Sequence, residues 1–321
     1  MTVSVRSFAK INIGLRIGPR RPDGFHELRT VYQTIDLHDV VRMKVAGGSG
    51  IEVRSGSRGV PTDESNTCYR TAESVLRTLH QRAKVTIDIE KKLPVQGGLG
   101  GASSNAIATM CGLERALKKQ LSPEDRLRIA AEIGSDVPLF LIGGTILGIG
   151  RGEQVYPLAE HPALDCVVAT PEAGVSTPAA FAAWDRLADR EAKLTGAGKS
   201  STMNGFSHTV CAWLRGSSSG VPSRAGDRAE ALLLDLVRAG IENDFERVVF
   251  PQYPELHDLK RALERAGAKY ASLSGSGSTV YGLFASKMEA KKAADRLKAE
   301  GIRAQATRTL TRREYWRRMF V

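Results

Sequence analysis

Residues 93–105 read Leu-Pro-Val-Gln-Gly-Gly-Leu-Gly-Gly-Ala-Ser-Ser-Asn, a loop in which four of the residues 97–101 are glycine. The preceding segment, Val85–Glu90, alternates apolar and polar residues and predicts a half-buried strand. Apolar residues then recur at helical spacing after the loop, at Ala106, Ile107, Met110, Leu113 and Leu117. The sequence therefore predicts a strand, a glycine-rich loop and a helix in direct succession.

Such a loop predicts a phosphate-binding site. Glycines let the main chain approach an anion closely, and the free N–H groups at the start of a helix point toward it. A Rossmann dinucleotide turn does not fit, because Ser103 stands where a third glycine or alanine is required and Pro94 separates the loop from its strand. A plain surface loop remains the alternative interpretation.

Strand and helix patterns alternate along the rest of the chain. Strands are predicted over 35–45 and 280–284, and a helix begins at Pro123 after the N-cap Ser122 and stops at Gly134. Further helices are predicted over 229–239, 256–266 and 288–299, packed on an antiparallel sheet that includes the strands flanking 274–278. Residues 185–227 are polar and predict flexible loops around a short helix at 206–214.

Length and composition place the chain among globular proteins with two domains. It has 321 residues, of which 42% are hydrophobic and 25% charged. The uncharged stretch 137–150 is too short to span a bilayer, and the N-terminus lacks a signal-peptide pattern, so the expected compartment is the cytoplasm. The four cysteines are far apart and show no metal or disulfide spacing, which favours reduced thiols.

The formal net charge is +11, which permits an anionic partner. Much of the excess lies in an arginine-rich tail, where six arginines face one glutamate: Arg303, Arg308, Arg312, Arg313, Arg317, Arg318 and Glu314. No aromatic platform of an RNA-binding type accompanies them, so we expect a solvated surface and do not expect nucleic acid as the partner.

A second glycine-rich loop, Ser274-Gly-Ser-Gly-Ser278, lies between two apolar segments. Alone it fits an ordinary hairpin turn as well as a loop that contacts a phosphate. With five other stretches, however, the two loops resemble the signature motifs of the GHMP kinase superfamily, small-molecule kinases named for galactose, homoserine, mevalonate and phosphomevalonate. The stretches are 9–15, 21–28, 93–105, 135–153, 174–177, 242–244 and 272–278, so the resemblance covers most of residues 1–285.

The resemblance implies a two-domain fold of mixed α/β and α+β type, with mixed sheets and helices and the active site in the cleft between the domains. The N-terminal, ATP-binding domain would comprise 1–160, and the C-terminal domain 161–321, including the flexible stretch and the basic tail. The boundary is expected near 155–165. Ser135 and Phe25 depart from the alanine and tyrosine that are frequent in relatives. Neither departure removes a required function.

The same resemblance implies an ATP-dependent kinase with an alcohol acceptor and assigns catalytic roles to Lys10 and Asp136. Asp136 would accept the proton of the hydroxyl group, and Lys10 would orient Asp136 and keep it ionised. Whether Asp136 is a true base or a positioning group stays open, because a loose transition state needs little basic assistance. Mg²⁺ is expected with ATP, but no ligand for it can be assigned. ATP would bind at Pro94, Gly97, Gly98, Leu99, Gly100, Gly101, Ala102, Ser103 and Ser104.

The segment Arg21-Pro-Asp-Gly-Phe-His26 sets this chain apart within the superfamily and implies an acceptor that carries a cytidine diphosphate. Phe25 and His26 would hold the base, and Phe181 would cover its opposite face unless it is simply part of a core. Further substrate contacts would come from Asn12, Thr177, Gly275, Ser276 and Gly277. The oligomeric state is not predicted.

Three other hypotheses about the function stay open. The chain could be another GHMP kinase, such as a homoserine or mevalonate kinase. It could be a nucleic-acid-binding module that uses its positive charge. It could also be a catalytically silent relative, although the intact Lys10 and Asp136 argue against this.

Overall fold

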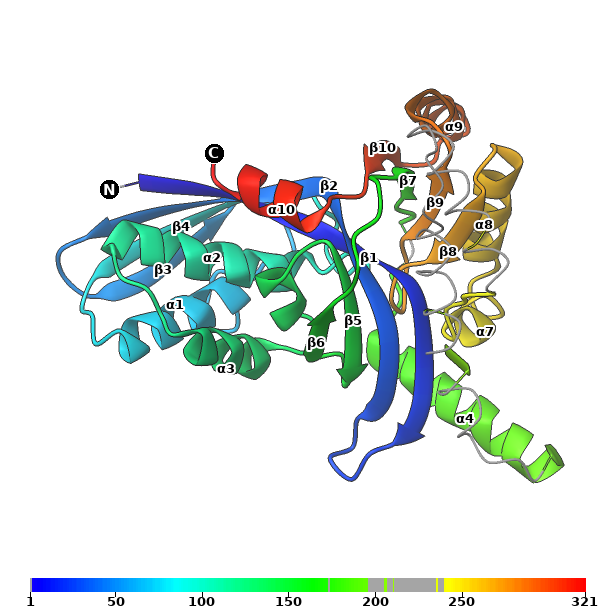
Figure 1. Cartoon of the computed structure of the whole chain (residues 1–321), viewed down its shortest axis with the longest axis horizontal. Helices are drawn as coiled ribbons and strands as arrows, with labels where there is room; N and C mark the ends of the chain where they lie inside the picture. The colour runs from blue at the N-terminus through cyan, green and yellow to red at the C-terminus, as the bar shows by residue number, and fades with distance from the viewer. Residues whose placement is uncertain (1, 173, 196–204, 207–209, 211–234, 236–239) are drawn as a thin grey trace.

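The computed structural model describes residues 2–172, 174–195, 205–206, 210, 235 and 240–321. Two sheets form its framework, one on the left and one on the right of Figure 1. The larger sheet has the order β3-β4-β2-β5-β6, with β1 paired to the other edge of β2. Only β3 and β4 are parallel neighbours. Its strands are β1 (Thr2–Arg20), β2 (His26–Ala46), β3 (Gly50–Ser55), β4 (Lys84–Glu90), β5 (Thr145–Gly150) and β6 (Gln154–Pro157).

The long hairpin of β1 and β2 connects the two halves of the molecule (Figure 1). Val5 and Phe8, near its open end, belong to the core of the first half, whereas Leu15 and Ile17 belong to the core of the second. Leu15 also forms a parallel bridge to Asn243. Because both faces of this strand are covered along most of its length, its residues are buried almost without interruption.

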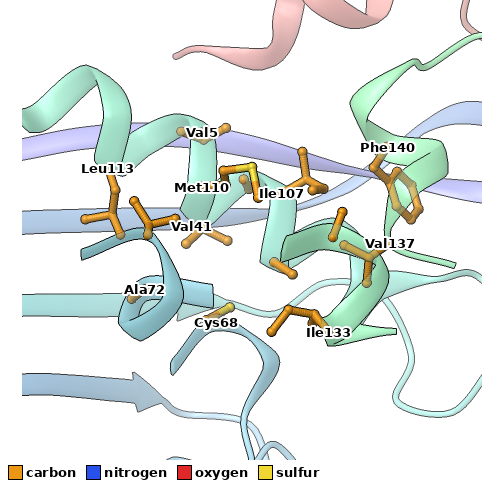
Figure 2. Close-up of a cluster of buried hydrophobic side chains, with 14 of the residues drawn as sticks. Val5, Val41, Cys68, Ala72, Ile107, Met110, Leu113, Ile133, Val137 and Phe140 are labelled. Atoms are coloured by element: carbon orange, nitrogen blue, oxygen red, sulfur yellow. The ribbon is translucent and has the colours of Figure 1, made fainter. Parts of the chain in front are cut away.

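Helices cover one face of the larger sheet. They are α1 (Thr67–Thr78), α2 (Gly101–Leu117), α3 (Pro123–Ile133) and the 3₁₀ helix η1 (Pro138–Leu141). Figure 2 shows Val5 and Val41 of the sheet facing Ile107 and Met110 of α2. Such a core forms because each amphipathic helix must bury its apolar stripe.

The second half is a four-stranded antiparallel sheet of order β10-β7-β9-β8. Its strands are β7 (Asp165–Ala169), β8 (Tyr270–Leu273), β9 (Val280–Phe284) and β10 (Ala304–Arg308). The helices of this half are α4 (Thr177–Thr195), α7 (Glu246–Val249), α8 (Pro254–Arg265) and α9 (Lys287–Ala299). The prediction of helices on an antiparallel sheet is confirmed for this described part of the chain.

The other local predictions agree with the structure. The strand before the glycine-rich loop, the helix after it, and the Ser122 cap with Pro123 at the first helical turn are all present. The predicted loop was wrong for residues 185–195, where α4 continues to Thr195. Ala180, Ala183, Trp184 and Ala188 are buried on this helix, at a spacing that the polar composition hid. The loops predicted over 196–227 and the helices over 206–214 and 229–239 lie, apart from a few residues, outside the described residues.

The six arginines of the tail are exposed or half-buried, as expected for a solvated surface, but the apolar residues between them pack on the first half of the molecule. The last part of the tail forms α10 (Arg312–Met319), which begins with a capping box between Thr311 and Glu314. Tyr315 and Met319 are buried in the core of the first half, so the chain returns to the first sheet at its end (Figure 1). The domain boundary near 155–165 stays a prediction. Among the described residues, no helix is long and apolar enough to cross a membrane.

Candidate active site

The glycine-rich loop leads from β4 into the first turn of α2 and lines a cavity of about 320 Å³. Gly100 is the N-cap residue in the left-handed conformation, and no side chain of the described residues caps this helix. The first N–H groups of α2 therefore keep their hydrogen-bonding capacity for another acceptor. The cavity is lined by Pro94, Gly97, Gly98, Leu99, Gly100, Gly101, Ala102 and Ser103 of the loop, together with residues of 59–67.

A buried carboxylate holds both ends of this loop. Asp39 on β2 is fully buried and accepts hydrogen bonds from Lys91 Nζ at 2.7 Å and from the main-chain N–H of Leu93 at 2.8 Å. Asn105 Nδ2, on α2, donates to the same carboxylate at 3.2 Å. A buried charge that is paired and fully hydrogen-bonded is stable, whereas an unpaired one is not. Asp39 thus fixes where the loop begins and ends.

The second glycine-rich loop packs directly against the first. A Cβ atom on Gly98 would lie 2.2 Å from the carbonyl oxygen of Ser274, and the Gly98 φ angle is +75°. Both facts require glycine here. Ser274 Oγ donates to the carbonyl of Gly98 at 2.9 Å, and Asn243 Nδ2 donates to the carbonyls of Leu273 and Gly275 at 2.8 Å each. The two loops therefore pack together as one unit.

A second cavity, of about 780 Å³, opens on the other side of this unit. Lys10 is 3% exposed, and its Nζ lies 3.3 Å from Asp136 Oδ2 and donates to Asn12 Oδ1 at 2.6 Å. Asn12 Nδ2 in turn donates to Thr30 Oγ1 at 2.8 Å, which fixes the amide with its oxygen toward Lys10. A cation and a carboxylate are therefore held side by side in the cavity wall.

Tyr32 completes this group. Its hydroxyl donates to Asp136 Oδ1 at 3.0 Å, so both carboxylate oxygens of Asp136 face a hydrogen-bond donor or a cation. Burial, followed by the charge of Asp136, raises the pKa of Tyr32 well above its usual value. The hydroxyl therefore remains a donor at physiological pH.

The far end of the cavity is aromatic. The rings of His26 and Phe181 are stacked, with centroids 4.9 Å apart and an interplanar angle of 9°. A base between two rings needs them about 7 Å apart, so no base fits between His26 and Phe181 as they stand. Phe25 is 51% exposed, and the guanidinium carbon of Arg151 lies 4.9 Å from its ring centre.

The structure brings most of the predicted site residues together. Gly98 and Ser103 line both cavities, and the second cavity is also lined by Lys10, Asn12, Phe25, His26, Asp136, Thr177, Phe181, Gly275 and Ser276. Ser104 and Gly277 line neither of these two cavities. Ser104 is buried within α2, and Gly277 faces Leu273 and Val175. Thr177 Oγ1 lies 2.7 Å from Ser276 Oγ, which joins α4 to the second loop.

Four residues of this region were missed from the sequence: Tyr32, Asp39, Arg151 and Asp185. For Tyr32 a signal existed, because strand alternation places residues 30 and 32 on one face of a hairpin strand. Asp39 had no local signal, since its partner Lys91 is 52 residues away.

Two family models match the chain. The model of the GHMP kinases N terminal domain matches residues 66–144, and the model GHMP kinases C terminal matches residues 228–303. A crystal structure of a homoserine kinase from Cytophaga hutchinsonii superposes with a TM-score of 0.69 over 97% of this chain and 95% of that one, at 21% identity. These findings confirm the predicted fold class. The protein is an ATP-dependent small-molecule kinase of the GHMP type.

Relatives with higher sequence identity indicate one family within the GHMP kinases. The 4-diphosphocytidyl-2-C-methyl-D-erythritol kinase of Geobacter sulfurreducens is 36% identical over 96% of this chain and 99% of its own length. The kinase of the same name from Solibacter usitatus is 37% identical over 87% of this chain and 80% of its own length. A crystal structure of 4-(cytidine 5'-diphospho)-2C-methyl-D-erythritol kinase has a TM-score of 0.71 at 30% identity and covers 95% of this chain and 98% of that one. The chain belongs to the family of 4-diphosphocytidyl-2-C-methyl-D-erythritol kinases.

Proposed function

We propose that this protein transfers the γ-phosphoryl group of ATP to the 2-hydroxyl of 4-diphosphocytidyl-2-C-methyl-D-erythritol, a reaction of the non-mevalonate isoprenoid pathway. One observation carries the proposal. The two cavities share Gly98 and Ser103, so a nucleotide in the first and an alcohol in the second would meet at the glycine-rich loop. Lys10 and Asp136 lie on the alcohol side of that junction.

In this proposal, ATP occupies the smaller cavity. Its phosphates lie against the N–H groups of Gly97 to Ser103 and the positive end of α2, which lowers the free energy of the bound anion. Mg²⁺ would neutralise part of the phosphate charge, and it needs few protein ligands because phosphate oxygens and water supply most of its shell. Ser103, with a hydroxyl at the junction of the cavities, is the side chain that we assign to it.

The acceptor occupies the larger cavity, with its reacting hydroxyl beside Asp136. Asp136 takes the hydroxyl proton as the oxygen forms its bond to the γ-phosphorus, and the bond to the bridging oxygen breaks so that ADP leaves. Lys10 holds the carboxylate in place and faces the developing negative charge. Asn12, fixed by Thr30, positions Lys10.

The remaining length of the acceptor extends toward the aromatic end. The cytidine lies at Phe25, His26 and Phe181, with Phe25 as the exposed ring available for stacking. The diphosphate lies near the hydroxyls of Thr177 and Ser276 and the main chain of Gly275 and Ser276. A cavity of about 780 Å³ is large enough for such a ligand.

The test is ADP release by the purified protein with Mg-ATP and one of three acceptors: 4-diphosphocytidyl-2-C-methyl-D-erythritol, homoserine or mevalonate. We expect turnover with the first alone, and a product that carries one additional phosphoryl group on the 2-oxygen. A reaction without acceptor controls for ATP hydrolysis. Turnover with homoserine or mevalonate instead, or no turnover with any of the three, would refute the proposal.

A further inference from the structure

His26 has a charged partner on an element far away in the sequence. Its Nε2 lies 2.7 Å from Asp185 Oδ1, although the two residues are 159 positions apart. Asp185 follows Phe181 by one helical turn on α4, so a single helix face supplies both the ring stacked on His26 and the carboxylate at its edge. His26 is 6% exposed, whereas the Asp185 side chain is 34% exposed. The imidazole is therefore fixed by the Phe181 ring on one face and by the Asp185 carboxylate at its edge.

The contact with Asp185 restricts which nitrogen of the His26 ring carries the proton. An ionised carboxylate only accepts hydrogen bonds, so Nε2 must carry the proton that Asp185 receives. In a neutral imidazole the other nitrogen is then an acceptor. Within the part of the chain that the structure describes, no hydrogen bond to Nδ1 is present, and His26 lines the larger cavity.

We propose that Asp185 is a positioning residue that fixes His26 with Nε2–H toward α4 and Nδ1 toward the cavity, so that the site selects a base with a hydrogen-bond donor at that place. This inference rests on the proposed function. Cytosine presents its exocyclic amino group as a donor, where uracil has a carbonyl oxygen that can only accept. An acceptor facing an acceptor leaves two lone pairs unpaired, which is the costly case in a buried site.

The contact predicts that a substitution of Asp185 changes recognition of the base without changing the rate of the chemical step. Asp185 lines the larger cavity beside His26 and does not line the nucleotide cavity, so the loss of its carboxylate should change recognition of the base and leave the phosphoryl transfer unchanged. In Asp185→Asn, the amide can turn its NH₂ group toward Nε2, which moves the ring proton to Nδ1. Asp189, one turn further along α4, is exposed and provides the matched control Asp189→Asn, because it removes the same charge from the same helix.

The first measurement needs no turnover. The ¹⁵N shifts of the His26 ring, assigned by comparison with His26→Gln, report which nitrogen carries the proton. We expect a proton on Nε2 alone in the wild-type protein and in Asp189→Asn, and a proton on Nδ1 in a substantial fraction of Asp185→Asn. A wild-type ring protonated on Nδ1, whether singly or doubly, would overturn the proposal.

The second measurement is direct binding of cytidine 5'-diphosphate and uridine 5'-diphosphate, with excess ADP present to fill the nucleotide cavity. We expect the preference for the cytidine compound to fall about tenfold in Asp185→Asn, as the loss of one hydrogen bond predicts, and to stay unchanged in Asp189→Asn. An unchanged preference in Asp185→Asn would show a merely structural role. Both measurements keep their meaning if the proposed phosphorylation itself fails, so the two failures can be told apart.

Kinetics complete the test where the acceptor is phosphorylated. We expect Asp185→Asn to raise KM for the cytidine-bearing acceptor about tenfold, with kcat and the KM for ATP within about twofold of wild type. An equal rise in both KM values would place the effect outside the base site and overturn the proposal.

Discussion

The smaller cavity is lined mainly by one stretch of chain, residues 94–105, with residues of 59–67 beside it, whereas the larger cavity is lined by residues of β1, β2, α4 and several loops. In the smaller cavity, a ligand would meet N–H groups whose positions follow from the loop and helix themselves. In the larger cavity, each functional group depends on a partner far away in the sequence, such as Asp136 on Tyr32 and His26 on Asp185.

This difference separates two ways of building a site. Main-chain sites tolerate changes of nearby side chains but fail when a backbone angle or a close approach is disturbed. Side-chain sites lose one contact at a time, so their variants should show graded effects. The predictions below rest on this contrast between main-chain and side-chain sites. A prediction that failed would weaken the contrast.

Asp136→Ala should have the largest effect. We expect kcat to fall by about 10²- to 10⁴-fold, because the acceptor hydroxyl loses the group that receives its proton. ATP affinity should stay within about twofold, since Asp136 does not line the smaller cavity. Steady-state kinetics and ADP titration measure the two quantities. Asp295→Ala, which removes an exposed carboxylate of α9, is the control. An unchanged kcat in Asp136→Ala would contradict the assigned role.

Asp39→Ala should lower the stability of the fold more than the loss of any single contact in the larger cavity. The substitution leaves Lys91, whose side chain is only 8% exposed, without its partner, and it removes the anchor of the glycine-rich loop. We expect the free energy of unfolding to fall by about 3–5 kcal/mol in urea titrations. Glu52→Ala, in an exposed pair with Arg54, should change stability little. Similar effects of the two variants would show that Asp39 is not an anchor.

Gly98→Ala tests the main-chain wall. The new Cβ would lie 2.2 Å from the Ser274 carbonyl oxygen at a φ angle of +75°, so the two loops must separate. We expect KM for ATP to rise about tenfold, and stability to fall by about 1–3 kcal/mol. In Gly47→Ala the added Cβ has no atom within 4 Å, and neither quantity should change. A normal KM for ATP in Gly98→Ala would mean that ATP does not depend on the packing of these loops.

The same contrast explains what could be predicted from the sequence. The strand, the glycine-rich loop and the start of α2 were predictable because glycine conformation and helical spacing are local properties. Asp39 and Asp185 were not, because their partners are 52 and 159 residues away. For Tyr32, strand alternation indicated the face of the strand but not its partner Asp136, which is 104 residues away. In the tail, the capping box from Thr311 to Glu314 can be recognised in the sequence. The packing of Tyr315 on the first half cannot, because it depends on tertiary structure.

Tyr32→Phe should have the smallest effect, because it removes one hydroxyl and leaves the buried ring in place. We expect kcat to fall about three- to tenfold, as the loss of one hydrogen bond to Asp136 predicts. Tyr315→Phe is the matched control, since that buried hydroxyl donates to Phe140 at 2.8 Å in the core of the first half. Its kcat should not change.

The pH dependence sharpens this last prediction. Because the pKa of Tyr32 is raised well above its usual value, the hydroxyl keeps its proton in the folded protein up to and beyond its unfolded pKa of about 10. The ratio of wild-type kcat to Tyr32→Phe kcat should therefore stay constant from about pH 6 to about pH 9. A ratio that falls toward one as the pH rises would mean that Tyr32 ionises in this range, and that the hydrogen bond to Asp136 does not hold its proton.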